Sequence, residues 1–278
     1  MRVSAYADAG AFLLVAGPLL MRAEAVNCLG LGIVSSLVSD PGRYPKAHLL
    51  SVEDPSGLHG VAWMTPPWPL GLSPMPRAAV ASLVEHVATL EDRVSGVVGP
   101  KPAVDEFKEL WLSREHRLQS TVEQRIYSLE RVSPPRSVPG ALRIATEGDR
   151  ECVMEWSRCF VQECGITDSP EAVRQHVRAS LANGSRVLWE SEGEAVSMAA
   201  FGGRTPSGVR INWVYTPPEH RRHGYASAVV AALSQKLLDQ GRKFCFLYTD
   251  LANPTSNSIY QTIGYSPVCD SAHHTFGD

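Results

Sequence analysis

The second half of the chain has a regular pattern of apolar and polar positions. Apolar residues recur at helical spacing in four segments, 149–164, 168–182, 226–238 and 254–263. Short apolar runs between glycine- or proline-containing turns predict strands at 141–146, 186–191, 195–203, 208–216 and 243–249. The last segment, 265–276, provides one or two closing strands. The predicted order is β-α-α-β-β-β-α-β-α-β, which indicates an α/β (α+β) domain with a mixed sheet.

The first half repeats this pattern less clearly. The sequence WMTPP around Thr65 resembles VYTPP around Thr216, 151 positions later. In both halves an apolar helix and then a strand follow, and the strand residues Val98 and Thr249 are again 151 positions apart. We interpret the pattern as an internal duplication. The alternative is two unrelated α+β halves that share a turn sequence.

A proline-rich segment separates the two halves. Residues 131–140, RVSPPRSVPG, contain three prolines and a glycine, which interrupt both helices and sheets. We therefore predict a linker there. The 278 residues are enough for two domains, which we place at 1–130 and 141–278.

Composition and residue spacing argue against several kinds of partner and site. The net charge of -3 gives no reason to expect nucleic acid or an anionic membrane as a partner. The six cysteines form no CxxC pair and the nine histidines no HExxH spacing, so we predict free thiols and no metal site. The apolar segment 11–26 is interrupted by Gly17-Pro18 and is too short to span a bilayer. We interpret it as a core-facing helix, and we expect a cytoplasmic protein.

The segment HRRHGYAS, residues 220–227, stands between a predicted strand and a predicted helix. A helix N-terminus has unpaired backbone N–H groups and the positive end of the helix dipole, so it attracts anions. Gly224 allows a close approach of the backbone, and Ala226 is small. Three side chains add positive charge: Arg221, Arg222 and His223. We interpret the loop as a pyrophosphate site; the alternative is a solvated basic patch.

These residues also carry a resemblance to a family. Residues 221–226, RRHGYA, match the (R/Q)xxGx(G/A) acetyl-CoA motif of the GNAT superfamily of N-acetyltransferases. The segment NPTSNSIYQTIGYSPV, which starts at Asn253, resembles the second signature of that superfamily, and the predicted element order is the same. The resemblance covers about 142–278. The first half resembles a degenerate copy of the GNAT fold, as in tandem bacterial members, and its basic-free segment 65–76 implies that the phosphate loop is lost.

The resemblance implies a role for each matching position. The pyrophosphate of coenzyme A would bind the backbone amides of residues 222–227. Pantetheine would pair with the strand before the loop, and an amide of that strand, near Val214, would hold the oxyanion. Asn253 and Asn257 would face the pantetheine arm. The full set of predicted cofactor contacts is Trp213, Val214, Tyr215, Arg221, Arg222, His223, Gly224, Tyr225, Ala226, Ser227, Asn253, Asn257 and Tyr260.

The implied reaction is transfer of acetyl from acetyl-CoA to an amine by direct attack, with no metal. Tyr260 would act as the general acid that protonates the departing thiolate; the alternative is a core aromatic residue. Asn253 is also typical of a helix N-cap residue, with or without a ligand contact. The general base stays unassigned, with Asp250 and Glu190 as candidates because each lies at the end of a predicted strand.

Two other functions fit the same residues. A non-catalytic acyl-CoA-binding regulatory module would keep the loop but would not need Tyr260. A GNAT-fold enzyme could instead use another acyl-CoA. The acceptor is a small-molecule or peptide amine that the sequence does not identify. We expect the N-terminal half to shape the acceptor cleft or to bury an interface, and a homodimer is compatible with this role.

Overall fold

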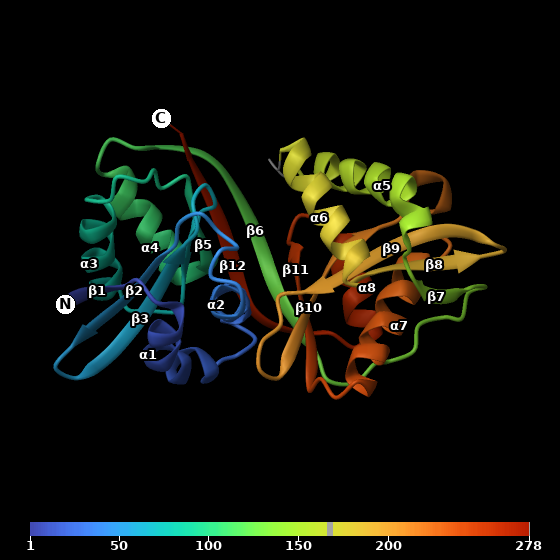
Figure 1. Ribbon diagram of the computed structural model, residues 1–278, viewed down its shortest axis with the longest axis horizontal. Coiled ribbons are helices and arrows are strands. Elements are labelled where there is room, and N and C mark those ends of the chain that lie inside the picture. Colours follow the sequence, from blue (N-terminus) through green and yellow to red (C-terminus); the bar gives the residue numbers. More distant parts are fainter. Residues whose placement is uncertain (166–168, 278) are drawn as a thin grey trace.

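The computed structural model describes residues 1–165 and 169–277, so Asp168, at the predicted start of a helix, lies outside the described residues. The described chain forms two lobes joined by one continuous sheet (Figure 1). Its twelve strands have the order β1-β2-β3-β4-β5-β12-β6-β11-β10-β9-β8-β7. The sheet is mixed, which confirms the predicted fold class.

The second half contains β7 (Ala141–Ile144), α5 (Arg150–Glu163), α6 (Pro170–Ala182), β8 (Arg186–Ser191), β9 (Glu194–Gly202), β10 (Gly208–Tyr215), α7 (Tyr225–Asp239), β11 (Phe244–Asp250), α8 (Pro254–Ile263) and β12 (Ser266–Gly277). The predicted order is confirmed, and the closing segment forms one long strand. Local signals set the helix starts. The Ser169 side chain accepts a hydrogen bond from the Ala172 amide at 3.1 Å, and Pro170 occupies the first turn of α6.

The first half contains β1 (Arg2–Tyr6), α1 (Ala9–Met21), α2 (Cys28–Ser39), β2 (His48–Asp54), β3 (Gly57–Met64), β4 (Leu70–Leu72), α3 (Arg77–Val87), β5 (Gly96–Pro100), α4 (Lys101–Leu112) and β6 (Arg117–Leu129). The order of elements is the same as in the second half. Strands β4 and β10 also correspond, because each pairs antiparallel with the preceding strand and parallel with the following one. The equivalence drawn between the two TPP turns is wrong: Thr65 follows β3, whereas Thr216 follows β10.

Gly17-Pro18, which interrupts the apolar run in the sequence, does not interrupt the helix. Helix α1 continues through Pro18 to Met21. The backbone of α1 thus accommodates a proline inside the helix, which removes one N–H donor but does not end it here. Phe12, Ala16 and Leu20 are buried, as predicted for a core-facing helix. In the part of the chain that the structure describes, no helix is long and apolar enough to cross a membrane.

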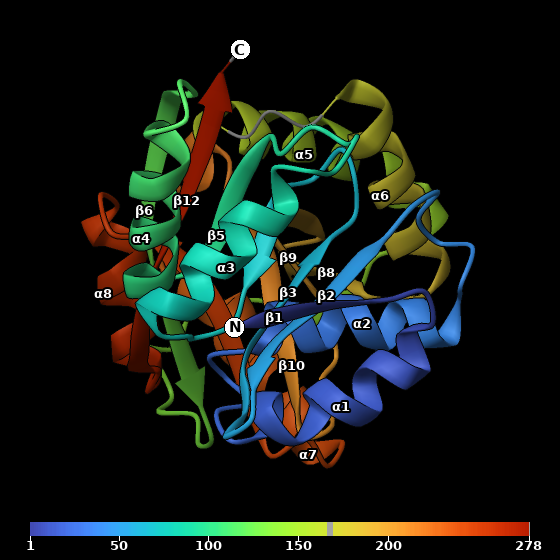
Figure 2. The same cartoon turned by 90° about the vertical axis from the view of Figure 1, so that its left-hand side faces the viewer.

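The two halves exchange their final strands. Strand β12 of the second half lies between β5 and β6 of the first, and β6 in turn pairs with β11. In Figure 2, where the N-terminal half faces the viewer, β12 lies beside β5 and β6. Ala272 and Phe276 of β12 belong to the hydrophobic core of the first half, whereas Tyr127 and Leu129 of β6 belong to that of the second. The division into domains at 131–140 stays a prediction. Each hydrophobic core nevertheless includes residues from a strand on the far side of this segment.

Helices cover the sheet of the second half on both faces. Helices α7 and α8 pack on one face around Val209, Ile211 and Leu247. Helices α5 and α6 pack on the opposite face around Leu188 and Met198. The start of α2 reaches this second face from the first half: the thiol of Cys28 lies 3.4 Å from the Tyr248 hydroxyl. The Glu24 carboxylate also accepts a 2.7 Å hydrogen bond from the Ser207 amide. One face of the sheet is thus shared by both halves.

Candidate functional site

Strands β10 and β11 separate part-way along their length. They pair only from Gly208–Phe244 to Arg210–Phe246, although β10 continues to Tyr215 and β11 to Asp250. Beyond that point β11 pairs with β6 on its other side. The backbone of β10 after Arg210 therefore has an open edge within the sheet. An extended ligand can pair with such an edge as an added strand.

A β-bulge distorts the same stretch of β10. Its register against β9 shifts between Asn212 and Tyr215, and Trp213 has a φ of 51°. A bulge adds a residue to one strand and redirects the side chains around it. The Trp213 ring consequently lies on the α5–α6 face, with ring centroids 5.0 Å from Phe160 and 4.6 Å from His176. The bulge places predicted contact residues of β10 where the strands have separated.

The loop after β10 brings further backbone N–H groups to the open edge. It contains a 3₁₀ turn at Pro218–His220, and both Arg222 and Gly224 have positive φ values, 66° and 88°. Helix α7 then starts at Tyr225, and no side chain of the described residues caps it. Its first-turn amides are therefore free to bind an anion, and the helix dipole favours negative charge at this position.

Gly224 lies at a closely packed point of this loop. An added Cβ would lie 3.0 Å from a methyl carbon of Val138, in the segment predicted as a linker. The φ of 88° is itself unfavourable for other residues. Glycine is therefore needed there both for the backbone conformation and for the available space.

The side chain of Arg221 does not point freely into the loop. Its guanidinium pairs with Glu163 of α5 at 2.7 Å and donates to the Thr216 carbonyl at 2.9 Å. The hydrogen bond to Glu163 raises the pKa of Arg221. The Tyr215 hydroxyl also donates to Glu163, at 3.1 Å. Arg221 thus ties the end of α5 to the loop, which leaves Arg222 and His223 as the exposed basic side chains beside the free amides.

Tyr260 of α8 lies in the core of the second half and is only 8% exposed. Its ring meets Tyr265 edge-on with 6.0 Å between centroids. Burial raises the pKa of Tyr260 well above the ordinary value, and the nearby thiol of Cys164 adds to the shift. The phenol therefore stays protonated at neutral pH, which is the state that a proton donor requires.

Both predicted asparagines have structural partners. The Asn253 side chain caps α8 by accepting from the Ser256 amide at 3.0 Å. The Asn257 amide donates to the backbone carbonyls of Asp250 and Asn253 at 2.9 and 2.7 Å, and its oxygen accepts from the Tyr127 hydroxyl at 3.2 Å. These bonds fix the start of α8 against the end of β11, so the asparagines position α8.

The two candidate bases differ in their surroundings. Asp250 is exposed at the end of β11 and accepts a 2.8 Å hydrogen bond from the Ala252 amide. Glu190 accepts from Arg143 at 2.5 Å, and Arg143 also pairs with Asp149. Because β9 separates β8 from β10, Glu190 lies two strands away from the bulge. Asp250 ends the strand that lies next to β10 in the sheet order, and the base stays unassigned.

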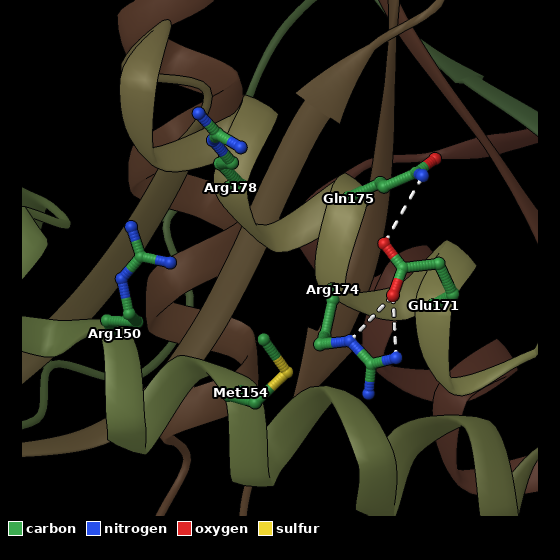
Figure 3. A pocket seen from close by; sticks show the side chains of 6 residues that line it. All are labelled: Arg150, Met154, Glu171, Arg174, Gln175 and Arg178. Atoms are coloured by element: carbon green, nitrogen blue, oxygen red, sulfur yellow. Dashed lines mark hydrogen bonds and ion pairs between the residues drawn. The ribbon is translucent and has the colours of Figure 1, made fainter.

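A separate groove lies between α5 and α6 (Figure 3). It has a volume of about 250 Å³ and is lined by Arg150, Met154, Glu171, Arg174, Gln175 and Arg178. Glu171 already accepts hydrogen bonds from Arg174 and Gln175, at 2.6 and 3.3 Å. Within residues 1–165 and 169–277 there is also no group of three metal-binding side chains. The open edge of β10 remains the better candidate site.

One set of polar residues on the α5–α6 face was not identified from the sequence. Arg186, His176, Arg210 and Asn212 each contain a buried polar atom without a hydrogen-bond partner in the described chain. The available signal was weak: Arg186 begins a strand that is otherwise largely apolar, and Arg210 and Asn212 alternate with Val209 and Ile211. Alternation showed that they share a face, but it could not show that the face is covered.

Comparison with known proteins identifies the fold. Residues 191–273 match the model of the FR47-like protein family. A Drosophila protein of known structure has a TM-score of 0.73 at 12% identity and covers 99% of this chain and 98% of its own. A GNAT-family acetyltransferase from Colwellia psychrerythraea has a TM-score of 0.61 at 12% identity, with all of both chains covered. The fold is that of the GNAT acetyltransferases.

The tandem arrangement also has a counterpart among solved structures. A tandem GNAT protein from the clavulanic acid biosynthesis pathway has a TM-score of 0.57 at 12% identity and covers 99% of this chain and 98% of its own. No curated protein sequence gives a significant match. At such low identities the likeness establishes the fold, and the chemistry has to be argued from the residues of this chain.

Proposed function

We propose that the protein is an N-acetyltransferase that transfers the acetyl group of acetyl-CoA to an amine by direct attack. The separation of β10 from β11, with the bulge at Trp213, is the observation that carries this proposal. It provides an open strand edge next to a helix N-terminus with free amides. The two features suit the two parts of coenzyme A, an extended amide-containing arm and a pyrophosphate.

The free amides of residues 222–227 would bind the pyrophosphate, and the exposed side chains of Arg222 and His223 would add charge-assisted contacts. Pantetheine would extend along the backbone of Trp213, Val214 and Tyr215. An amide at the bulge, near Val214, would donate to the thioester carbonyl and stabilise the oxyanion of the tetrahedral intermediate. In this arrangement the ion pair between Arg221 and Glu163 holds the loop in place.

The reaction needs only proton transfers and positioning. The amine nitrogen attacks the thioester carbon, the tetrahedral intermediate collapses, and the bond to sulfur breaks. The departing thiolate takes a proton from the Tyr260 hydroxyl, which burial keeps protonated. The proton lost by the attacking amine goes to water or to a base that stays unassigned; Asp250 is better placed for this role than Glu190, which is ion-paired with Arg143.

Two alternatives use the same open edge. A regulatory module would bind acyl-CoA but turn nothing over, and a related enzyme would use a different acyl group. No feature of the described structure favours the regulatory module or the use of another acyl group over acetyl transfer. Calorimetric titration with acetyl-CoA and a longer acyl-CoA, followed by a thiol-release assay with amines, separates the three functions.

The first test is a Gly224→Asp variant titrated with acetyl-CoA and with CoA. We expect micromolar binding by the wild type and a loss of at least about 100-fold in the variant, because the aspartate places a side chain and a negative charge at the pyrophosphate. Gly241→Asp is the matched control: Gly241 also has a positive φ, 90°, and lies just beyond the other end of α7. Equal binding by the two variants, or no binding by the wild type, would contradict the proposal.

A further inference from the structure

Arg186 is a buried cation without a counter-ion. Its side chain is 0% exposed, and its Nη2 atom has no partner in the described chain. Its other contacts are weak: Nε lies 3.4 Å from the Ser180 hydroxyl, and Nη1 lies 3.6 Å from the Met198 sulfur. Burial lowers its pKa to about 10. A buried guanidinium without a paired anion is costly, so its presence in the sheet needs a reason.

Three neighbouring residues also have a buried polar atom without a hydrogen-bond partner in the described chain. His176 Nε2, Arg210 Nε and Asn212 Oδ1 are also buried and without partners among the described residues. Arg186 and Asn212 both pair with Ala200 of β9, and Arg210 pairs with Gly202. The central strand therefore adds only a methyl group or a hydrogen to this part of the face. The register places the side chains of Arg186, Arg210 and Asn212 on the same face of the sheet.

The cluster is strongly positive. The pKa of His176 falls to about 4 through burial first, and then through the charges of Arg186, Arg210 and Arg43. Arg43 belongs to the first half, in the loop after α2. None of these three arginines forms an ion pair with a described carboxylate. Arg210 interacts electrostatically with the buried Cys28 and Tyr248, and Arg43 has a weak ring contact with Tyr44. No described residue supplies a counter-ion for the cluster.

The cluster adjoins the proposed reaction centre. Asn212 and Trp213 are the bulge residues themselves, and Arg210 lies at the last paired position before β10 and β11 separate. The Trp213 ring lies 5.3 Å from the Arg186 guanidinium carbon and 4.6 Å from the His176 ring. Val209 and Ile211, which alternate with Arg210 and Asn212, face α7, so the cluster occupies the other face of the sheet.

We propose that Arg186 and Arg210 bind an anionic group of the acceptor, and that the acceptor is a small amine that carries a carboxylate or a phosphate. An oxyanion would pair with the free donors of both arginines, while Asn212 and Trp213 would orient the remainder of the molecule toward the thioester. The inference rests on the proposed function, because it assigns the acceptor of the same reaction.

Paired amines test this inference. Acetyl-CoA turnover is followed by thiol release with amino acids and their carboxamides, and with aminoalkyl phosphates and the corresponding amino alcohols. We expect the charged member of the preferred pair to have a kcat/KM at least about tenfold higher, the size of a charge-assisted contact. The two series distinguish carboxylate from phosphate. Equal or better turnover of the uncharged members by the wild type overturns the inference.

Variants identify the residues responsible. In Arg186→Met we expect kcat/KM for the charged amine to fall at least about 30-fold, with little change for its uncharged partner and unchanged acetyl-CoA binding by calorimetry. Arg178→Met, in the outer groove of Figure 3, is the matched arginine control. If Arg186→Met does not fold, Arg210→Met replaces it, because Arg210 is only partly buried. Retention of the charge preference in the folded variant overturns the assignment.

A stability measurement distinguishes failure of the proposed function from failure of the acceptor assignment alone. Thermal melting with the same panel should show that charged members raise the Tm of the wild type, because an anion relieves the buried positive charge, and that this shift is lost in the arginine variant. If the wild type does not bind acetyl-CoA, the proposed function fails. If it binds acetyl-CoA but shows neither a charge preference in turnover nor an arginine-dependent Tm shift, the acceptor assignment alone fails.

Discussion

The connection from β10 to α7 in the second half and that from β4 to α3 in the first occupy equivalent places in the fold. Residues 216–224 form the first, with two positive φ values and two arginines and two histidines. Residues 73–76 form the second, which is Ser-Pro-Met-Pro and ends at Pro76, a residue without an N–H donor. The same topology therefore carries the proposed anion site in the second half, whereas the described connection 73–76 of the first half has no basic side chain.

The strands before these connections differ as well. Strand β4 has only three residues, and its ladder with β3 has no register shift. The ring of Trp63 lies so close to Gly71 that an added Cβ would come within 2.2 Å of it, so the strand is covered by a buried side chain. Strand β10 extends beyond its pairing with β11 and carries the bulge. An open strand edge thus needs a strand longer than its ladder, together with a neighbour that diverges.

The largest effect is expected from a residue that links the halves. Phe276→Ala should lower the free energy of unfolding by about 3–5 kcal/mol, because the buried ring is replaced by a cavity. Phe276 lies two residues from the end of the chain but stacks on Phe107 of the first half. We expect the two halves to unfold in a single transition in urea, with the signals from both halves changing together. Separate transitions, with the second half unaffected, would show that the exchanged strand does not couple them.

A smaller effect, confined to turnover, is expected from Tyr260→Phe. Loss of the hydroxyl removes the proposed acid and should lower kcat about 100-fold, while acetyl-CoA binding by calorimetry stays unchanged. Tyr265→Phe is the control, because that neighbouring hydroxyl bonds to Ser234 at 2.9 Å and has no role in the mechanism. An unchanged kcat in the Tyr260 variant would leave this tyrosine as a core aromatic residue.

The smallest effect compares two arginines near the corresponding helix starts of the two halves. Arg222→Met should weaken acetyl-CoA binding about tenfold and reduce its dependence on salt, because one charge beside the pyrophosphate is lost. Arg77→Met, at the start of α3, removes an exposed arginine that pairs with Glu106 and should leave binding unchanged. The same titrations at low and high salt measure both variants. Equal losses would mean that Arg222 acts only through the overall charge.

The sequence by itself determined much of the fold. Apolar periodicity and turn residues near Ser169, Gly224 and Asn253 predicted the element order of the second half, because these signals act within a few residues. The loop at 220–227 was found for the same reason: a glycine, basic residues and a helix start lie next to one another in the chain. The weaker repeat of the same pattern in the first half predicted a duplication. The turns matched at Thr65 and Thr216 are, however, not equivalent.

The tertiary structure decided what local signals cannot reach. The exchange of β6 and β12 depends on pairing between strands more than a hundred positions apart, and either strand would satisfy the same apolar pattern. The partner of Arg221 is Glu163, 58 positions away, which no local motif indicates. Arg186 became informative only once α6 and the bulge covered it, because the cost of an unpaired charge depends on burial, and burial is a property of the assembled fold.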